Sequence, residues 1–184
     1  MISLGVIVFT GPSGVGKSTV VNHFLRKGFP FVKIPSYTTR SPRSDDKKGD
    51  YVYVTEEEFL KLKEERQFLE TSYHYGSWYG TPLCTYYEYL EDGYVVLKDV
   101  NPAGAKSFKE EFGDICLSIF ICPPSEEELF SRLYKRDGFV NEVRREESLE
   151  ELRYKNDFDF CVVNNVLNDT IGEIGKILSS RGYS

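Results

Sequence analysis

Short runs of apolar residues alternate along this chain with segments in which apolar residues recur at helical spacing. The runs predict strands and cover residues 6–9, 31–34, 51–54, 94–97, 115–121 and 160–163, with further short strands at 68–70 and 73–79. The predicted helices begin after residues 19 and 55 and cover 81–90, 126–136, 141–156 and 170–179. Strands that alternate with helices predict an α/β fold with a parallel sheet.

Two polar stretches interrupt this alternation, at residues 36–94 and 125–156. Residues 36–50 contain almost no aliphatic side chain and many turn formers, which predicts a loop. Thr55 and Glu58 have the spacing of a capping box, which marks the start of a helix. The stretches therefore read as insertions in the α/β pattern rather than as linkers.

The segment 11–19, GPSGVGKST, lies between the first strand and the first helix. Gly11 and Gly16 give the spacing G-x-x-x-x-G-K-[ST] of a phosphate-binding loop. In such a loop, backbone N–H groups face the phosphates, Lys17 reaches the outer phosphates and Ser18 offers its hydroxyl to Mg²⁺. A glycine-rich turn without function is the alternative, but the flanking strand and helix favour a nucleoside triphosphate site.

Composition limits the class of protein. A length of 184 residues with 40% hydrophobic residues suits one globular domain with a substantial core. No apolar run approaches the length of a membrane span, and the chain opens directly into the first strand, without room for a signal peptide. A formal net charge of −6 argues against nonspecific nucleic-acid binding. We therefore expect a cytoplasmic protein without a membrane or nucleic-acid partner.

The cysteines have no C-x-x-C spacing, which argues against a metal cluster. They are Cys84, Cys116, Cys122 and Cys161. Without an export signal, we expect them to be free and mostly buried thiols in a reducing compartment.

A cluster of cationic side chains lies in the polar loop of this otherwise acidic protein. Its members are Arg40, Arg43, Lys47 and Lys48. Guanidinium groups in such a loop can hold an anion by paired hydrogen bonds, although a solvated loop is the alternative. With the loop at 11–19, the cluster suggests a donor phosphate and an acceptor phosphate on one small fold.

Several further motifs follow one another along the chain. They are Ser36-x-Thr38-Thr39-Arg40-x-Pro42-Arg43, Gly49-x-Tyr51, Phe68-x-Glu70, Tyr79-Gly80-Thr81-Pro82, Pro123-Pro124-Ser125-x-Glu127-Glu128-Leu129 and Val162-Val163-Asn164-Asn165. In this order, together with the loop at 11–19, they resemble the guanylate kinase family over nearly the full length. The resemblance implies a P-loop kinase fold with a central parallel sheet, an inserted mixed α/β acceptor-binding region and a helical lid.

The resemblance also implies an activity and a division of the chain. The activity is transfer of the γ-phosphoryl group of MgATP to GMP, which gives ADP and GDP. Residues 1–35, 95–124 and 157–184 would form the core with the ATP site, residues 36–94 the GMP-binding region, and residues 125–156 the lid.

Glu70 is the residue expected to select the purine of the acceptor. Guanine presents donors at N1 and N2 and an acceptor at O6, so a carboxylate can take both donors while Ser36 and Thr81 donate to O6. Adenine would place its N1 acceptor against the carboxylate, and an unpaired buried polar group costs about 1–3 kcal/mol, more when charged. An ordinary surface carboxylate is the alternative for Glu70.

The remaining site residues are assigned by the resemblance. The acceptor phosphate would be held by Arg40, Arg43, Tyr51 and Tyr79, of which the two tyrosines could also be ordinary sheet aromatics. ATP would be bound by Gly11, Ser13, Gly14, Val15, Gly16, Lys17, Ser18, Thr19 and Asn165, and Mg²⁺ by Ser18 and Asp99.

The catalytic set implied by the resemblance neutralises charge on the transferred phosphoryl group. It consists of Lys17, Arg43, Arg132, Arg136 and Arg145. Arg145 is preferred to its neighbour Arg144, and a solvated helix face is the alternative for Arg132. No histidine base is needed, because a nucleoside monophosphate with a second pKa of about 6 is mostly dianionic near neutrality.

The chain departs from the family pattern after the strand at 94–97. Asn101 stands where the family has an aspartate that helps to hold the base, and Lys98 occupies an aliphatic position. The amide of Asn101 can accept from guanine N2 but adds no charge, so a weaker bond to guanine is expected. This departure favours one alternative, a kinase of the same scaffold acting on another phosphate-bearing acceptor.

A second alternative is an inactive interaction module built on a guanylate-kinase-like domain. Such modules tend to lose the phosphate loop, whereas Lys17 and Ser18 are present here. The sequence leaves the oligomeric state open.

Overall fold

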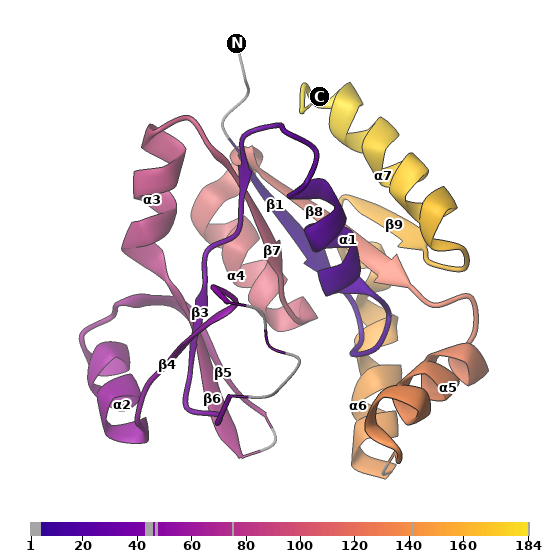
Figure 1. Cartoon of the computed structure of the whole chain (residues 1–184), viewed down its shortest axis with the longest axis horizontal. Helices are drawn as coiled ribbons and strands as arrows, with labels where there is room; N and C mark the ends of the chain where they lie inside the picture. Colours follow the sequence, from indigo (N-terminus) through magenta and orange to yellow (C-terminus); the bar gives the residue numbers. More distant parts are fainter. Residues whose placement is uncertain (1–4, 43–45, 47, 75, 141, 184) are drawn as a thin grey trace.

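The computed structural model describes residues 5–42, 46, 48–74, 76–140 and 142–183. A central sheet has the strand order β2-β7-β1-β8-β9, with neighbouring strands parallel (Figure 1). Its strands are β1 (Gly5–Thr10), β2 (Phe31–Val32), β7 (Val95–Asp99), β8 (Cys116–Cys122) and β9 (Phe160–Val163). The α/β fold with a central parallel sheet is therefore confirmed.

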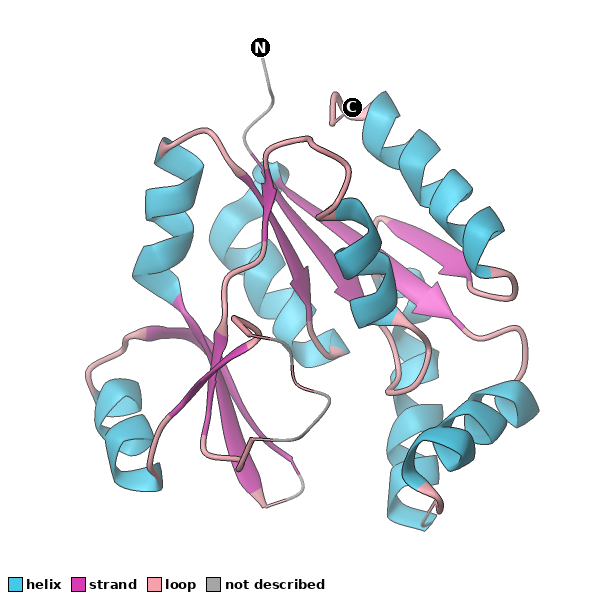
Figure 2. Ribbon diagram, in the orientation of Figure 1, coloured by secondary structure: helices cyan, strands magenta, loops and turns pink. Residues whose placement is uncertain are grey.

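Helices cover both faces of the central sheet (Figure 2). Successive residues of β1 point to opposite faces, so Ile7 and Phe9 join one buried cluster while Val6 and Val8 join another. The first cluster includes side chains of α1 (Lys17–Phe24) and α7 (Leu167–Ser180), and the second includes side chains of α3 (Leu83–Glu91) and α4 (Pro102–Phe112). This double burial explains why the strands are apolar throughout.

A second, mixed sheet is formed within the first polar stretch. Its order is β4-β3-β6-β5, in which β3 is parallel to β4 and antiparallel to β6, and β5 is antiparallel to β6. The strands are β3 (Ser36–Thr38), β4 (Tyr51–Tyr53), β5 (Phe68–His74) and β6 (Ser77–Pro82). Helix α2 (Glu56–Glu64) precedes β5, and its predicted capping box between Thr55 and Glu58 is present.

The second polar stretch forms two helices beside the central sheet (Figure 1). They are α5 (Glu126–Asp137) and α6 (Glu142–Arg153), and the short helix η2 (Tyr154–Asp157) follows. Ser125 caps α5, which has acidic residues in its first turn and basic residues in its last turn, as the helix dipole favours. The division of the chain into core, GMP-binding region and lid stays a prediction.

The structure differs from the sequence expectations in several elements, including α7, which begins at Leu167 instead of residue 170. Residues 36–38 form β3 within a stretch expected to be a loop, because pairing with β4 and β6 stabilises a short polar strand. Residues 81–82 end β6, so α3 begins two residues later than predicted. Helix α4, which is followed by η1 (Gly113–Ile115), was not predicted; its start contains the small residues Ala103, Gly104 and Ala105.

The expectation of mostly buried thiols is only half correct. All of the cysteines are free, but Cys84 and Cys161 are exposed, while Cys116 and Cys122 are buried. Burial raises the pKa of the Cys116 thiol to about 12.

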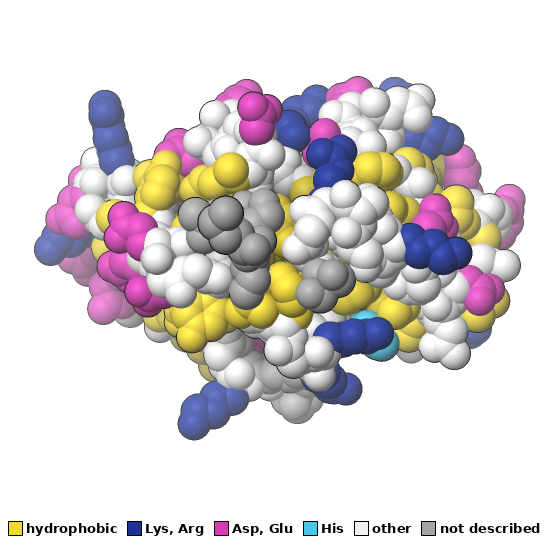
Figure 3. Space-filling view, turned by 90° about the horizontal axis from the view of Figure 1, so that it is seen from above, with side chains coloured by type: hydrophobic (Ala, Val, Ile, Leu, Met, Phe, Trp, Pro, Cys, Tyr) yellow, Lys and Arg dark blue, Asp and Glu magenta, His cyan; other side chains and the backbone are white. Residues whose placement is uncertain are grey.

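The surface carries charges of both signs. Figure 3, which views the molecule from the end that bears both termini, shows acidic, basic and hydrophobic side chains interspersed. In the part of the chain that the structure describes, no helix combines the length and the apolar character required to cross a membrane.

Candidate active site

The loop between β1 and α1 depends on glycine at both ends. Gly11 and Gly16 adopt φ angles of 128° and 103°, in the left-handed region that disfavours side chains. A Cβ atom on Gly11 would lie 2.4 Å from the carbonyl oxygen of Ile121, and one on Gly16 would lie 2.5 Å from Nδ2 of Asn164. The glycines thus let the loop close tightly in front of α1, whose first N–H groups are suited to phosphate oxygens.

Lys17 folds back onto this loop. Its Nζ atom donates hydrogen bonds to the carbonyl oxygens of Gly11, at 2.6 Å, and Pro12, at 2.9 Å. Burial lowers the pKa of Lys17, while the carboxylates of Glu151 and Asp99 act in the opposite direction. The ammonium group is thus held at the loop, where phosphate oxygens could replace the carbonyl partners.

Ser18 and Asp99 bring two oxygen atoms together at the ends of α1 and β7. Ser18 Oγ donates to Asp99 Oδ2 at 2.6 Å. Burial alone would raise the pKa of Asp99, but the ammonium of Lys33 and the hydroxyl of Ser18 hold it below its ordinary value. Among the described residues no group of three His, Cys, Asp or Glu could hold a metal ion. A hydroxyl with one carboxylate still suits Mg²⁺, which keeps several waters and takes further ligands from phosphates.

Polar contacts continue from this pair to the second sheet. Lys33 Nζ lies 3.6 Å from Asp99 Oδ1 and 3.0 Å from Asp50 Oδ1. The carbonyl oxygen of Asp50 accepts a hydrogen bond of 3.2 Å from the N–H of Ser36, the first residue of β3. The phosphate loop is therefore joined to the second sheet by a series of charged and polar groups.

Two arginines reach the phosphate loop from α5 and α6. Nη2 of Arg136 lies 3.2 Å from Ser13 Oγ, and Nη2 of Arg144 lies 3.3 Å from the same atom. Asp137 holds both guanidinium groups: its Oδ2 accepts from Arg136 at 2.9 Å and from Arg144 at 2.6 Å. These arginines lower the pKa of Asp137. Asp137 therefore keeps the two cations together over the loop.

The structure places Arg144 and Arg145 in different surroundings, and the catalytic role of Arg145 stays a prediction. The guanidinium carbon of Arg145 lies 4.3 Å from the centre of the Phe130 ring. The neighbouring Arg144 points to Ser13 instead, because adjacent residues of a helix project in different directions. Arg144 is thus the arginine of this pair that the structure brings to the phosphate loop.

Arg132 contacts the end of β9 instead of the phosphate loop. Its Nε atom donates to Glu128 Oε1 at 2.8 Å, and its Nη1 atom donates to the carbonyl oxygen of Asn164 at 3.0 Å. Buried Asn164 in turn donates from Nδ2 to the carbonyl oxygen of Val15 at 2.8 Å. Asn165, the predicted ATP-binding residue, is exposed next to it.

Five of the predicted acceptor-binding residues share one face of the second sheet. Directly paired residues of neighbouring strands point to the same face, and residues two apart in a strand do so as well. The observed pairs are Ser36 with Tyr51, Thr38 with Tyr79, and Thr81 with Glu70. Ser36, Tyr51, Glu70, Tyr79 and Thr81 therefore lie on a common face.

Arg40 lies beside the two tyrosines of this face. Its guanidinium carbon is 5.0 Å from the centre of the Tyr51 ring, and the Tyr51 and Tyr79 rings are 6.3 Å apart. Arg40 also makes two hydrogen bonds to Asp46, of 2.9 and 2.8 Å, and these bonds raise its pKa. Arg43, the other predicted phosphate-binding arginine, lies outside the described residues, as does Lys47.

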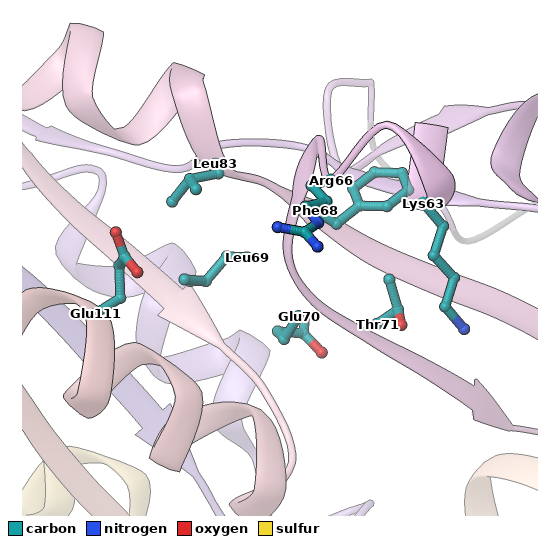
Figure 4. A pocket seen from close by; sticks show the side chains of 8 residues that line it. All are labelled: Lys63, Arg66, Phe68, Leu69, Glu70, Thr71, Leu83 and Glu111. Carbon is teal, nitrogen blue, oxygen red and sulfur yellow. The ribbon is translucent and has the colours of Figure 1, made fainter. Parts of the chain in front are cut away.

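Glu70 is half-buried and held by its partner across the sheet. Thr81 Oγ1 donates to Glu70 Oε1 at 2.7 Å, so the proton of the Thr81 hydroxyl is directed to the carboxylate. A Cβ atom on Gly104 of α4 would lie 3.2 Å from Asn101 Oδ1 and 3.5 Å from Glu70 Cδ, which places both side chains beside that glycine. Glu70 also lines a hollow of about 370 Å³ along β5, together with Leu83, Glu111 and other residues (Figure 4).

The two residues that depart from the family pattern, Asn101 and Lys98, both form hydrogen bonds within the protein. Asn101 caps α4, because its Oδ1 atom accepts from the N–H of Gly104 at 2.8 Å. Lys98 is buried, with 2% of its surface exposed, and its Nζ atom donates to Ser36 Oγ. Burial lowers the pKa of Lys98, while Asp99 and Glu70 favour its charged form.

Three residues that support this site were given no role from the sequence alone. Asp137 and Asp46 orient arginines, and Asn164 holds the phosphate loop. Asp137 has a local signal, since it follows Arg136 at the end of a helix. The contacts of Asn164 with Val15 and Arg132 join residues far apart in sequence, so no spacing rule identifies them.

Comparisons with known proteins agree with this arrangement. The family model described as guanylate kinase matches residues 4–181. A guanylate kinase of Prochlorococcus marinus subsp. pastoris is 39% identical over 95% of this chain and 97% of its own length, and one of Clostridium tetani is 36% identical over 96% and 86%.

A solved structure is also similar. The crystal structure of guanylate kinase from Anaplasma phagocytophilum superposes with a TM-score of 0.80 at 29% identity, covering all of this chain and 88% of that one. The phosphate loop, the second sheet and the family match lead to one conclusion: this chain is a kinase and belongs to the guanylate kinase family.

Proposed function

We propose that this chain transfers the γ-phosphoryl group of ATP to GMP, which yields ADP and GDP. The single observation that carries this proposal is the series of polar groups from Ser18 through Asp99 and Lys33 to Asp50 and Ser36. It supports a site in which a donor phosphate loop lies at one end of these contacts and an acceptor face at the other. Family membership favours this activity over another acceptor and over an inactive interaction module.

The donor side binds and orients the triphosphate. The N–H groups of the loop and the first turn of α1 bind phosphate oxygens, and Lys17 exchanges its carbonyl partners for the outer phosphates. Ser18 and Asp99 would hold Mg²⁺, which would supply positive charge to the phosphates when bound. In this assignment Gly11, Ser13, Gly14, Val15, Gly16, Thr19 and Asn165 complete the ATP-binding set.

The acceptor side holds GMP by its phosphate and its base. Arg40, Tyr51 and Tyr79 bind the phosphate, and Arg43 is proposed to join them. Glu70, oriented by Thr81, accepts from N1 and N2 of guanine. Asn101 offers its amide oxygen near N2, while that oxygen also caps α4.

Catalysis consists of alignment and neutralisation of charge. Arg136 and Arg144, joined by Asp137, approach the loop at Ser13 and stabilise the phosphoryl group as it moves between the two phosphates. Arg132 supports the end of this lid through Asn164. A cytoplasmic location and the lack of a nucleic-acid partner stay predictions.

A coupled assay of ADP formation with a panel of acceptors tests the proposal. The panel contains GMP, dGMP, IMP, AMP and UMP at equal concentration with saturating MgATP. We expect GMP to give the highest kcat/KM. Equal use of all acceptors, or none at all, would refute the assignment.

A further inference from the structure

Lys98 is an unusual residue for a buried strand. It lies in β7 between Leu97 and Asp99, and only 2% of its surface is exposed. Burying an ammonium group costs several kcal/mol unless it gains charged or hydrogen-bonding partners. Here the carboxylates of Asp99 and Glu70 act on it, and Ser36 Oγ accepts its hydrogen bond. Because burying this charge is costly, we asked what the Lys98 ammonium group contributes to the site.

The Lys98 bond determines which way the Ser36 hydroxyl can act. An ammonium group has three donors and no acceptor, so Ser36 Oγ is the acceptor in this bond. The proton of Ser36 must therefore point to another group. Ser36 lies on the same sheet face as Glu70 and Thr81, and within the described part of the chain no protein acceptor takes this proton. Its direction is open to a bound base.

Thr81, the other hydroxyl expected to bind guanine O6, is already engaged. Its Oγ1 donates to Glu70 Oε1 at 2.7 Å, so its proton serves the carboxylate. Asn101 adds no charge to the base site, since an amide replaces the expected carboxylate. The reading of the purine six-position then depends on Ser36.

We propose that Lys98 is a specificity-determining positioning residue, which fixes the Ser36 hydroxyl as a donor so that the site admits 6-oxopurine nucleotides and rejects 6-aminopurine nucleotides. A 6-oxo group accepts this hydrogen bond. A 6-amino group would oppose donor to donor, and leaving such buried groups unpaired costs about 1–3 kcal/mol. The inference rests on the proposed function, because it deepens the choice of acceptor at the same site.

The test compares Lys98→Met, which keeps the length of the side chain but removes the donor, with the wild type. We measure kcat/KM for GMP, IMP and AMP, the KM for ATP, and the thermal midpoint. GMP and IMP share the 6-oxo group, so both should lose about tenfold in kcat/KM, mainly through KM, as expected for about 1.4 kcal/mol. AMP use should rise, because the released Ser36 hydroxyl can accept a hydrogen bond from the 6-amino group, while the KM for ATP should stay constant. The GMP-to-AMP ratio of kcat/KM should therefore fall by more than the loss for GMP alone.

Ser36→Ala and the double variant identify the route of the effect. Ser36→Ala should give the same losses for GMP and IMP, and adding Lys98→Met to it should change kcat/KM for GMP by less than about twofold, because both changes remove one interaction. Lys106→Met is the control: it removes an ammonium that pairs with Asp157 outside the site, and it should leave the GMP-to-AMP ratio unchanged.

Some outcomes overturn the inference. An unchanged GMP-to-AMP ratio in Lys98→Met, or additive losses in the double variant, shows a merely structural lysine. If Lys98→Met does not fold, Ser36→Ala decides, since an intact ratio there refutes the proposal. If the wild type prefers GMP and both variants keep the wild-type GMP-to-AMP ratio, only this inference is refuted. If the wild type itself shows no preference for GMP, the proposed function is refuted.

Discussion

Ser18 Oγ donates a hydrogen bond of 2.6 Å to Asp99 Oδ2, and this contact joins the first turn of α1 to the end of β7. Both residues sit where the parallel strands of the central sheet end, the region in which ligands bind to open α/β sheets. Lys33 lies 3.6 Å from Asp99 Oδ1 and competes for the same carboxylate. A metal cation bound at Asp99 would therefore share this carboxylate with the ammonium group of Lys33.

Replacing Asp99 by asparagine should weaken the use of Mg²⁺. The substitution removes the negative charge while retaining an oxygen for Ser18. We expect a loss of about 10–100-fold in metal affinity or activity, the scale seen for groups that support a metal site. The measurement is activity against Mg²⁺ concentration at saturating ATP and GMP. Asp50→Asn, which removes the other carboxylate partner of Lys33, is the control; an unchanged Mg²⁺ dependence in Asp99→Asn would contradict the assignment.

Arg144 and Arg145 provide a matched pair of adjacent arginines. Arg144→Ala removes a guanidinium from the phosphate loop and should lower kcat by about 10²-fold or more, as loss of one transition-state donor does. Arg145→Ala removes a contact with Phe130 and should cost only about 0.5–1 kcal/mol of stability, with little change in kcat. Steady-state kinetics and thermal unfolding of the two variants check this. A greater loss of kcat in Arg145→Ala than in Arg144→Ala would support the catalytic role that the resemblance implies for Arg145.

Glu70→Gln tests the selection of the base. The amide oxygen can still accept from Thr81, but the amide N–H₂ group would face the guanine donors. We expect the KM for GMP to rise about 10–100-fold, consistent with about 1.5–3 kcal/mol for hydrogen bonds to a charged group, while the KM for ATP stays constant. Glu111→Gln changes a second carboxylate that lines the same hollow and serves as the control (Figure 4). Equal losses for GMP and ATP would argue against a base-reading role.

The sequence predicted the parts of this site that depend on local spacing. The phosphate loop follows from Gly11 to Ser18, and the start of α2 follows from Thr55 and Glu58. The face shared by Ser36, Glu70 and Thr81 does not follow from spacing, because it depends on the pairing of strands that are distant in sequence. The resemblance to a family named these residues, and strand register explains their common direction.

Other features could be decided only by tertiary contacts. The sequence could not choose between Arg144 and Arg145, since the phase of α6 relative to the loop depends on how the helix packs. The low hydrophobic content of this helix gives a weak amphipathic pattern, and Ser148 is its buried residue. In the same way, Lys98 was read as an intrusion at an aliphatic position, because its partner Ser36 lies on another sheet.

Glu151 should make the stability of the ligand-free protein depend on pH. Burial and the nearby carboxylate of Glu147 raise its pKa to about 7, although Lys17 acts to lower it. A carboxyl group with a folded pKa of about 7 and an unfolded value of 4.5 is protonated more often in the folded state between these values, so stability falls as pH rises through this window. The loss of folding stability caused by ionising Glu151 is therefore absent below pH 4.5 and complete above about pH 7.

Glu151→Gln removes this penalty. The variant should gain up to about 3 kcal/mol in free energy of unfolding relative to the wild type at pH 8, and nothing at pH 4. Urea unfolding between these pH values measures the difference. Glu150→Gln, at an exposed neighbouring position, controls for the loss of charge. Parallel curves for Glu151→Gln and the wild type would show that Glu151 ionises at an ordinary pH.

Asn101→Asp tests whether the amide limits the use of GMP. Aspartate caps a helix as well as asparagine does, and a negative charge at the start of α4 is favoured by the helix dipole, so the fold should be retained or gain about 0.3–1 kcal/mol. The added charge lies beside Gly104 and Glu70, where it can accept from guanine N2 by a stronger, charge-assisted bond.

A comparison of GMP with IMP should show whether the Asn101→Asp variant acts through the N2 amino group of guanine. We expect the KM for GMP to fall and the KM for IMP, which lacks the N2 amino group, to stay constant. The variant brings a second carboxylate close to Glu70, and repulsion between the two would raise both KM values together. A rise in both KM values would mean that the site is adapted to the neutral amide of Asn101. In that case the ammonium group of Lys98 compensates the charge of Glu70 but not that of a second carboxylate beside it.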